Sequence, residues 1–437
     1  MTLTAARTAA RSRVRRDASQ LSALATAVRL TPRPTGRGLV VALIPAHNEQ
    51  DTIDEALRSL REQGSTPDLI VVVADNCTDA TARKAAAAGA HVFETVDNVH
   101  RKAGALNQAL DQLLPELRDA DAILVMDADS FLAPTFLAEA QRHLSEKVGG
   151  VGGVFTGRPG GGYVGLLQRN EYARCARDVA RLRGKVLVLT GTATLFSART
   201  LRHVVRARAA GVLPGGAAQV YDTKVLTEDN ELTLALLHLG YGVISPKGCR
   251  LTTEVMESWR DLYRQRLRWK RGALENLRDY GLTRVTLSYW WRQLVTFVGV
   301  VVTATYLLSL AWSFAVEGAI HLHPLWLAVT GVFVAERVVT VRAPRAAADG
   351  AGGDAGLRDG LRRLPPRCPR ESALGHAHSQ RKDMVIMYDK GIATTAGTAA
   401  AGALPFTGVN LIWVAIGGFA LLMAAGALWR IVPRTQA

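Results

Sequence analysis

Asp127 and Asp129 are the residues whose type and spacing most directly suggest chemistry. They follow the apolar run Ala122–Met126, which predicts a buried strand, and a single alanine separates them. Two carboxylates at the end of a strand can both face a hard divalent cation such as Mg²⁺ or Mn²⁺, and that cation can bridge to phosphate oxygens. A solvated loop after a strand has the same sequence pattern, so this pair alone leaves both interpretations open.

Asp75 and Lys102 are two further candidates for a nucleotide site. Asp75 follows the apolar residues Val71–Val73, so its carboxylate could accept hydrogen bonds from the base or ribose of a nucleotide, or could cap a helix. Lys102 precedes a predicted helix, where its charge would add to backbone N–H groups that favour an anion. A surface lysine is the alternative at that position.

Glu228 and Asp229 stand just before the apolar run Leu232–Leu239, which predicts a helix. Acidic residues in the first turn of a helix are favoured by the helix dipole, and this alone would explain them. The chemical alternative is a general base that takes the proton from an acceptor hydroxyl.

Gln265, Arg268 and Trp269 lie on the basic amphipathic segment Trp259–Arg271. Arg268 could bind a phosphate, and the indole of Trp269 offers a flat face on which a sugar ring can stack. A helix that lies on a membrane surface, with its arginines reaching towards water, would give the same pattern. The two interpretations are compatible.

The elements that must position these residues alternate along the chain from Gly38. Short apolar runs predict strands, and the segments between them predict helices of about ten residues. This alternation indicates an α/β domain with a mostly parallel sheet covered on both faces, whose ligands bind beyond the carboxyl ends of the strands. The predicted strands are Leu39–Ile44, Leu69–Val73, Ala90–Glu94 and Ala122–Met126, and the predicted helices are Thr52–Glu62, Thr78–Ala88 with Thr78 as its cap, and Ala103–Leu114.

The net charge of +15 is concentrated in two segments. Residues 1–37 hold eight arginines and one acid, and residues 342–390 hold ten lysines or arginines and six acids. Neither segment interleaves its arginines with aromatics, as a surface for single-stranded nucleic acid would, so we expect no nucleic-acid partner and place these segments near anionic lipid headgroups. The four cysteines form no CxxC pair, which argues against a zinc site or a disulfide framework and suits a reducing cytoplasm.

Three apolar runs near the C-terminus suggest membrane spans. Leu294–Val316 contains no charged residue and is long enough to cross a bilayer. Leu325–Val341 is a weaker candidate because a glutamate and an arginine interrupt it, and Leu411–Trp429 is the third. The basic residues around the catalytic segment predict a multi-pass protein of the cell membrane whose catalytic domain faces the cytoplasm.

The order and spacing of these motifs closely resemble the family 2 glycosyltransferases, and within them the membrane-embedded synthases of polysaccharides such as cellulose, hyaluronan and poly-N-acetylglucosamine. The resemblance covers about residues 38–315, and its most specific part is the combination of Thr227–Asp229 with Gln265-x-x-Arg268-Trp269. The matching motifs, in chain order, are Pro45–Glu49, Asp75, Lys102–Asn107, Asp127-x-Asp129, Gly191–Ala193, Thr227–Asp229 and Gln265–Trp269.

This resemblance implies a GT-A fold, which is a Rossmann-like nucleotide-diphospho-sugar transferase domain. It also implies a UDP-sugar donor, a glycan or lipid acceptor, and inversion at the anomeric carbon by direct displacement. By this resemblance, Asp75 binds the uridine with Lys102 nearby, and Asp127 and Asp129 hold the diphosphate and a Mg²⁺ or Mn²⁺ ion, with Asp129 the closer ligand. Asp229 is the base, with Glu228 beside it. Gln265, Arg268 and Trp269 close over the diphosphate and the acceptor.

The C-terminus contains a second resemblance. Leu404–Gly408, with an apolar run and Arg430 after it, resembles a Gram-positive sortase signal. This leaves a cell-surface anchored protein with an inactive transferase-like domain as the alternative function. A Rossmann dehydrogenase fits less well, because Pro45–Glu49 stands where the glycine-rich GxGxxG motif would be needed.

We therefore expect five parts along the chain. They are a basic disordered tail (1–37), a GT-A glycosyltransferase domain (38–292), a transmembrane region (293–341), a disordered linker (342–403), and a sorting-signal-like segment with a C-terminal transmembrane helix (404–437).

Overall fold

The computed structural model describes residues 23–215 and 218–318, and a few scattered residues between 328 and 339. The predicted linker, the sortase-like segment and the span over Leu411–Trp429 lie outside the described residues, and so does most of the span predicted over Leu325–Val341. Of the two compact units in the chain, the one that carries the sheets ends at Leu287.

The described end of the basic N-terminal segment contacts the catalytic domain. Residues 23–30 are helical. Beyond them, Arg33 pairs with Asp121 at 2.7 Å and Arg37 pairs with Asp68 at 2.6 Å. At these two positions the positive charge is therefore neutralised by partners within the domain.

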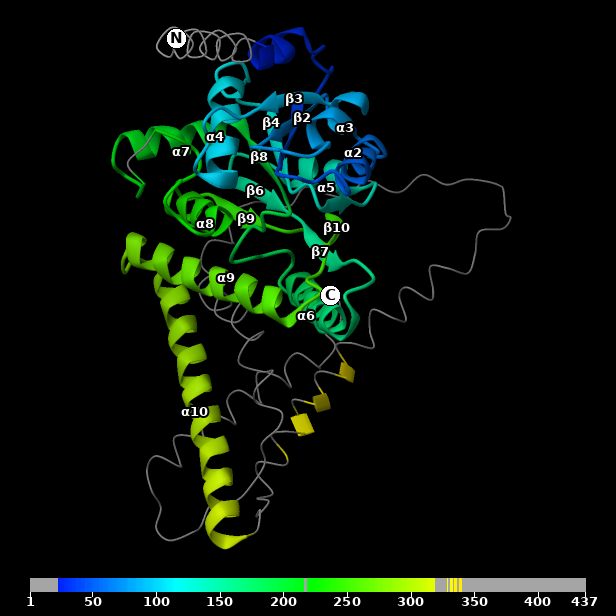
Figure 1. The fold of residues 1–437 in the computed structure, drawn as a ribbon. Helices are drawn as coiled ribbons and strands as arrows, with labels where there is room; N and C mark the ends of the chain where they lie inside the picture. Colours follow the sequence, from blue (N-terminus) through cyan, green and yellow to red (C-terminus); the bar gives the residue numbers. More distant parts are fainter. Residues whose placement is uncertain are drawn as a thin grey trace, which may run out of the picture. The chain divides into compact units, whose positions relative to one another are not determined.

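Within the described residues, ten strands form a seven-stranded and a three-stranded sheet (Figure 1). The order in the large sheet is β3-β2-β1-β4-β8-β6-β9, and in the small sheet it is β5-β10-β7. The strands are β1 (Val40–Ala46), β2 (Leu69–Ala74), β3 (His91–Glu94), β4 (Ala122–Met126), β5 (Ser130–Leu132), β6 (Val148–Gly152), β7 (Val154–Gly157), β8 (Ala193–Ser197), β9 (Gly242–Ile244) and β10 (Arg250–Thr253).

Helices lie on both sides of the large sheet, with α2, α3 and α5 on one side and α4, α7 and α8 on the other (Figure 1). Alternate residues of β1, beginning with Val40 and Ala42, join a core cluster with Leu57 of α2 and Phe136 of α5, because successive side chains of a strand point to opposite faces. The helices are α2 (Ile53–Arg61), α3 (Thr81–Ala87), α4 (Arg101–Leu113), α5 (Phe136–His143), α6 (Gly162–Arg181), α7 (Ala198–Ala209), α8 (Glu228–His238), α9 (Trp259–Tyr280) and α10 (Leu287–Glu317).

The large sheet is mostly parallel, as predicted, and becomes mixed through one strand, β8. β3, β2, β1 and β4 run parallel, as the strand–helix alternation predicted. β8 pairs antiparallel to both β4 and β6. The reversal matters for the site, because it brings the residues just before β8 to the carboxyl end of β4.

The cap predicted for α3 is wrong. The helix begins at Thr81 after Ala80, and the backbone N–H of Thr78 instead donates to the side-chain oxygen of Asn48, at 2.8 Å. This bond joins the loop after β1 to the loop after β2.

The predicted localisation, a multi-pass protein of the cell membrane with a cytoplasmic catalytic domain, is corrected by the structure. A membrane-spanning helix needs about 20 consecutive, mainly apolar residues. Among the helices of the described residues, including α10 where the first span was expected, none combines the required length with the required apolar character.

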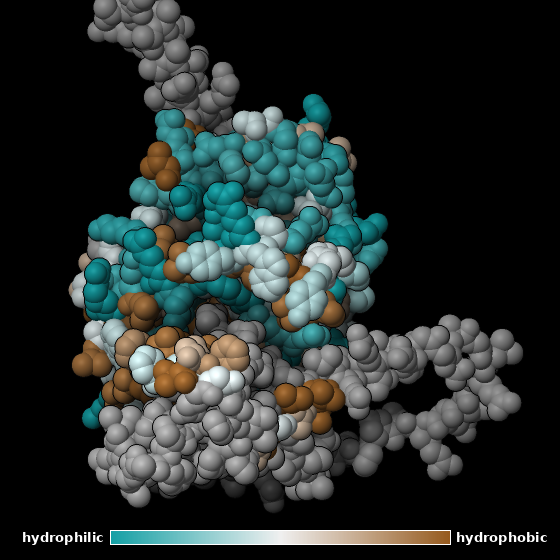
Figure 2. Space-filling view, turned by 60° about the horizontal axis from the view of Figure 1, so that its bottom comes forward, coloured by the Kyte–Doolittle hydropathy of each residue, from teal (hydrophilic) through white to brown (hydrophobic). Residues whose placement is uncertain are grey.

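Apolar side chains are nevertheless exposed at the start of α9. Trp259, Tyr263 and Leu267 are each more than half exposed, and Trp259 lies near the ring of Tyr163 of α6, with 6.4 Å between the ring centroids. Figure 2 shows brown patches of hydrophobic residues on a surface that is otherwise mainly hydrophilic.

A buried ion pair fixes α8 against its neighbours. Arg208 of α7 and Glu231 of α8 are 2.6 Å apart, and their side chains are almost inaccessible to solvent. The hydroxyl of Tyr280, at the end of α9, donates to the other oxygen of Glu231, also at 2.6 Å. Three helices therefore meet at one carboxylate, one turn after the start of α8.

A close contact holds α9 against the start of α8. A Cβ atom added to Gly272 would lie 2.5 Å from the hydroxyl oxygen of Thr227, so only glycine fits there without movement. The amide nitrogen of Asn276, one turn later, donates to the backbone carbonyl of Thr227 and to the side chain of Asn230. These contacts set the position of α9 relative to Glu228 and Asp229.

We expect Glu231→Ala to lower the free energy of unfolding by about 3–5 kcal/mol, because it leaves the buried Arg208 guanidinium without its counter-charge. Denaturant unfolding followed by circular dichroism measures this. Glu62→Ala is the matched control, since Glu62 pairs with Arg58 at the surface and such pairs contribute roughly 0–1 kcal/mol. Equal losses in the two variants would contradict the structural role given to Glu231.

Candidate active site

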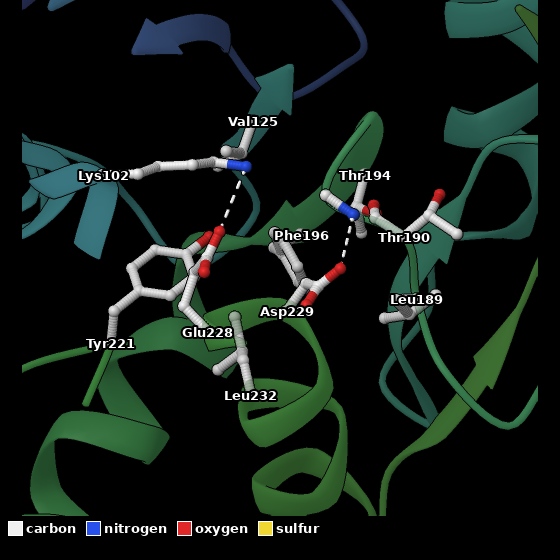
Figure 3. A pocket seen from close by; sticks show the side chains of 11 residues that line it. Lys102, Val125, Leu189, Thr190, Thr194, Phe196, Tyr221, Glu228, Asp229 and Leu232 are labelled. Carbon is white, nitrogen blue, oxygen red and sulfur yellow. Dashed lines mark hydrogen bonds and ion pairs between the residues drawn. The ribbon is translucent and has the colours of Figure 1, made fainter. Parts of the chain in front are cut away.

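Two adjoining pockets lie where the sequence motifs converge. The strand-end pocket lies at the carboxyl ends of β1, β2 and β4, where the strand order changes direction. The helix-start pocket lies between β4, β8 and the start of α8 (Figure 3). The strand-end pocket is lined by Pro45, Ala46, His47, Glu49, Asp75, Lys102, Asp127, Ala128 and Asp129. The helix-start pocket is lined by Lys102, Val125, Leu189, Thr190, Gly191, Thr194, Phe196, Tyr221, Glu228, Asp229 and Leu232.

Lys102 lines both pockets and joins their carboxylates. Its ammonium nitrogen lies 2.5 Å from Oδ1 of Asp127 and 3.2 Å from Oε1 of Glu228 (the second contact is drawn in Figure 3). Burial alone would lower the pKa of Lys102, but the two carboxylates outweigh it and raise the pKa well above its usual value. The lysine is therefore a fixed positive charge between two acidic groups that come from distant segments.

Asp229 is held by two backbone N–H groups. Gly191 donates to one carboxylate oxygen at 3.0 Å, and Asn230 donates to the other at 2.7 Å. A Cβ at position 191 would lie 2.8 Å from the Lys102 nitrogen, so the end of the lysine side chain would have to shift to admit any larger residue. Burial, followed by the charge of Glu228, raises the pKa of Asp229 to about 6, while Lys102 and the two N–H groups oppose the rise.

Asp127 and Asp129 share the strand-end pocket with Glu49. Burial, followed by the negative charges of Asp127 and Glu49, raises the pKa of Asp129 to about 7. Burial also raises the pKa of Asp127 and of Glu49. With Asp75, four acidic side chains thus line one pocket, which is an unfavourable accumulation of negative charge.

Asp75 is buried at the end of β2 and leaves one oxygen for a ligand. Its Oδ1 atom accepts hydrogen bonds from Thr95, Asn98 and Asn76 at 2.7, 2.8 and 3.1 Å. No described residue donates to its Oδ2 atom. The carboxylate is therefore oriented by its surroundings and is not a helix cap.

The three residues of the Gln265–Trp269 motif lie on one helix but differ in environment. The side-chain oxygen of Gln265 is buried without a hydrogen-bond partner among the described residues. Arg268 is exposed, yet its charge opposes the rise that burial causes in the pKa of Asp127 and, after Lys102, helps to lower the pKa of Glu228, so it lies close to both pockets. One face of the Trp269 ring is covered by the guanidinium of Arg266, 4.6 Å from the ring centroid.

The structure adds residues to which the sequence assigned no individual role. His47 and Glu49 line the strand-end pocket, and their place after the first predicted strand was a usable signal. Tyr221 lines the helix-start pocket from a segment between α7 and α8 that has no recognisable pattern. No feature of the sequence alone indicated it.

Comparison with known protein families gives a match over residues 36–272 to the family described as glycosyltransferase like family 2. This match covers more than half of the chain and contains both pockets. The chain belongs to glycosyltransferase-like family 2. It is therefore a glycosyltransferase, and the mixed α/β sheet agrees with the GT-A-like fold that the sequence predicted.

Among curated proteins, this glycosyltransferase is similar to poly-beta-1,6-N-acetyl-D-glucosamine synthases. It is 26% identical over 283 residues to the one from Staphylococcus aureus (strain MSSA476), and the aligned residues cover 61% of this chain and 64% of that protein. It is 27% identical over 256 residues to the one from Staphylococcus epidermidis, which covers 55% of this chain and 56% of that protein. The aligned region thus spans less than two thirds of the length of these relatives.

Among solved structures, the glycosyltransferase is similar to a mannosyltransferase from Pyrobaculum calidifontis in complex with GDP-Man and Mn²⁺. The identity is 20% and the TM-score 0.42, with 63% of this chain and 76% of the other covered. A glucosyl-3-phosphoglycerate synthase from Mycobacterium tuberculosis in complex with Mn²⁺, UDP and glucosyl-3-phosphoglycerate gives 19% identity and a TM-score of 0.35, with 60% and 85% covered.

Asp129→Asn should stabilise the metal-free protein, and more so at higher pH. Because the folded-state pKa of about 7 exceeds the unfolded value of about 4, folded Asp129 keeps a proton that the unfolded chain releases. Stability is therefore lost as pH rises between these two values, and asparagine avoids this loss. We expect the melting temperature of the variant to exceed that of the wild type by several degrees at about pH 8 and by less at about pH 5.

Asp119→Asn is the control, because a hydrogen bond from Arg202 lowers the pKa of Asp119 and its replacement should not stabilise the protein. Thermal melts of the three proteins in a chelating buffer provide the measurement. A melting-temperature difference for Asp129→Asn that does not grow with pH would contradict the unfavourable charge described for the strand-end pocket.

Proposed function

We propose that this glycosyltransferase transfers a hexose from a UDP-sugar to a glycan or lipid acceptor, with inversion at the anomeric carbon and with a divalent cation. The observation that carries the proposal is the arrangement of two sets of carboxylates around Lys102. Asp127 and Asp129 lie in the strand-end pocket, and Glu228 and Asp229 lie in the helix-start pocket. Direct displacement needs such a division, because the leaving group and the base must stand on opposite sides of the reacting carbon.

Asp229 is the base in this proposal. An acceptor hydroxyl is a poor nucleophile near neutral pH, so a carboxylate must take its proton as the new bond to the anomeric carbon forms. A pKa of about 6 leaves Asp229 mostly ionised at neutral pH while keeping it more basic than an ordinary aspartate. Its two backbone hydrogen bonds hold the carboxylate in a fixed direction, and Glu228 keeps Lys102 beside it.

The donor occupies the strand-end pocket in this proposal. The free oxygen of Asp75 accepts a hydrogen bond from the uridine, and Lys102 and Arg268 bring positive charge to the diphosphate. Gln265 and Trp269 close the pocket from α9, and the buried oxygen of Gln265 then gains a partner. The face of Trp269 that Arg266 leaves uncovered remains for the sugar.

Asp127 and Asp129 suit Mg²⁺ or Mn²⁺. Such ions prefer oxygen ligands, and a cation would relieve the negative charge that raises the pKa of Asp129. Within the described part of the chain, no three His, Cys, Asp or Glu side chains are grouped so that they could hold an ion by themselves. The remaining ligands must then come from water and the diphosphate. When bound, the cation supplies Lewis-acid stabilisation of the charge on the departing diphosphate.

The curated relatives make N-acetylglucosamine the first donor to test, since they are named as synthases of a polymer of that sugar. We expect radiolabelled UDP-N-acetylglucosamine to give more product than UDP-glucose or UDP-glucuronate when each is incubated with the purified protein and the cation. Turnover with only another UDP-sugar would contradict N-acetylglucosamine as the donated sugar, but it would still support transfer from a UDP-sugar. No turnover with any nucleotide sugar would favour the inactive transferase-like domain.

Chelation should abolish transfer, and added Mn²⁺ or Mg²⁺ should restore it. The physical reason is that two carboxylates and a diphosphate cannot share one pocket without a counter-charge beyond Lys102. Product formation is measured in excess EDTA and again after metal is returned. Full activity in EDTA would show that Asp127 and Asp129 act without a metal ion.

Asp229→Asn keeps the shape of the base and removes its basicity, so turnover should fall by roughly 10²–10⁴. The affinity for UDP should be nearly unchanged, because the donor contacts lie in the other pocket. Glu228→Gln is the matched comparison and should cost less, since it weakens only the hold on Lys102. Near-normal turnover in Asp229→Asn would show that another residue is the base, and Glu228 would be the next candidate.

A further inference from the structure

Tyr221 presents its side chain to the helix-start pocket beside the proposed base. The residue is only 4% exposed, and its ring lies next to Glu228 and near Asp229 in the close-up view (Figure 3). Lys102, Glu228 and Asp229 line the same pocket. Tyr221 comes from the segment between α7 and α8. None of the residues proposed to bind the donor lies on that segment.

The backbone of Tyr221 is held by Asn107 of α4. The Tyr221 N–H donates to the side-chain oxygen of Asn107 at 2.9 Å, and the Asn107 amide donates to the Tyr221 carbonyl at 2.8 Å. Asn107 is itself only 2% exposed. Because Lys102 lies on the same helix, α4 fixes the position of Tyr221 relative to Lys102.

The hydroxyl of Tyr221 has no hydrogen-bond partner among the residues that the structure describes. A buried tyrosine hydroxyl normally finds one, because leaving it unpaired costs free energy. Burial raises the pKa of Tyr221 well above its usual value, so the group stays protonated and serves as a hydrogen-bond donor. The pocket therefore contains a hydrogen-bond donor that no described residue uses.

We infer that the hydroxyl of Tyr221 binds the carbohydrate acceptor by donating a hydrogen bond to an acceptor oxygen next to the one that attacks. The inference rests on the proposed function, in which Asp229 takes the proton of the attacking hydroxyl. We assign the acceptor, and not the donor, as the ligand of this hydroxyl because Tyr221 lines the pocket that contains the base. The proposed donor-binding residues Asp75, Asp127 and Asp129 line the other pocket. Phe196 and Leu232 give this pocket apolar walls against which the carbon skeleton of a sugar can pack.

Tyr221→Phe removes the hydroxyl and keeps the ring, so it tests the inference directly. The loss of one neutral hydrogen bond should raise the acceptor KM by about three- to tenfold. The KM for the donor, and the affinity for UDP with Mn²⁺ measured by titration calorimetry, should change by less than about twofold on the same reasoning. Tyr163→Phe is the matched control, because Tyr163 is 67% exposed and lines neither pocket.

The assay uses the UDP-sugar and the acceptor that the wild type turns over, starting with UDP-N-acetylglucosamine and a β-1,6-linked N-acetylglucosamine oligosaccharide. An unchanged acceptor KM in Tyr221→Phe would overturn the inference, and so would a rise confined to the donor KM. Failure of the proposed function is a separate result, since it would appear as near-normal turnover in Asp229→Asn whatever Tyr221→Phe does.

A second variant tests the role of Asn107 as a positioning residue. Asn107→Ala should raise the acceptor KM at least as much as Tyr221→Phe, because it frees the backbone that aims the hydroxyl. The double variant should then raise it no further than Asn107→Ala alone, since both changes act through one group. Independent, multiplying effects would overturn the positioning role, and melting temperatures confirm that each variant is folded at the assay temperature.

Discussion

The ammonium group of Lys102 is the interaction on which the site depends. Asp127 follows β4 and Glu228 begins α8, about a hundred residues later, and both approach one nitrogen. Without that positive charge, Asp127, Asp129, Glu228 and Asp229 would repel one another across two adjoining pockets. With it, Glu228 has a lowered pKa although burial acts in the opposite direction, and the two pockets form one charged site.

The rest of the fold holds the two sides of that contact at a fixed separation. The antiparallel β8 brings Gly191 to Asp229, and the Arg208–Glu231 pair fixes α8 one turn beyond it. Close packing at Gly272 then places α9 over the same helix start. The family match tells what class of reaction the domain performs, and these contacts explain how residues from four separate segments reach one place.

The sequence predicted much of the strand-end pocket and less of the helix-start pocket. β4 and the parallel strands around it were predictable because apolar runs of strand length alternate with helices, and the polar residues after β1, β2 and β4 had to meet at one edge. The antiparallel β8 was not predictable, because its direction is decided by pairing with distant strands. The contact of Arg266 with one face of the Trp269 ring was not predicted, because it depends on how the two side chains turn on α9. Tyr221 was missed because a hydrogen bond to a helix far along the chain, not a local pattern, brings it to the site. The span predicted over Leu294–Val316 folds as part of α10, but no helix of the described residues is both long and apolar enough to cross a membrane, and the other predicted spans lie largely outside those residues.

The most direct test of the account is the pKa of the Asp229 carboxyl group in the metal-free protein. Carbon-13 NMR of protein labelled at its aspartates measures it, with Asp229→Asn used to assign the signal. The structure gives about 6 for the wild type, and Lys102→Met, which keeps the length of the side chain and removes the charge, should raise it. Lys102→Arg should leave it close to the wild-type value. A pKa that is the same in wild type and Lys102→Met would contradict the claim that Lys102 governs the charge of both pockets.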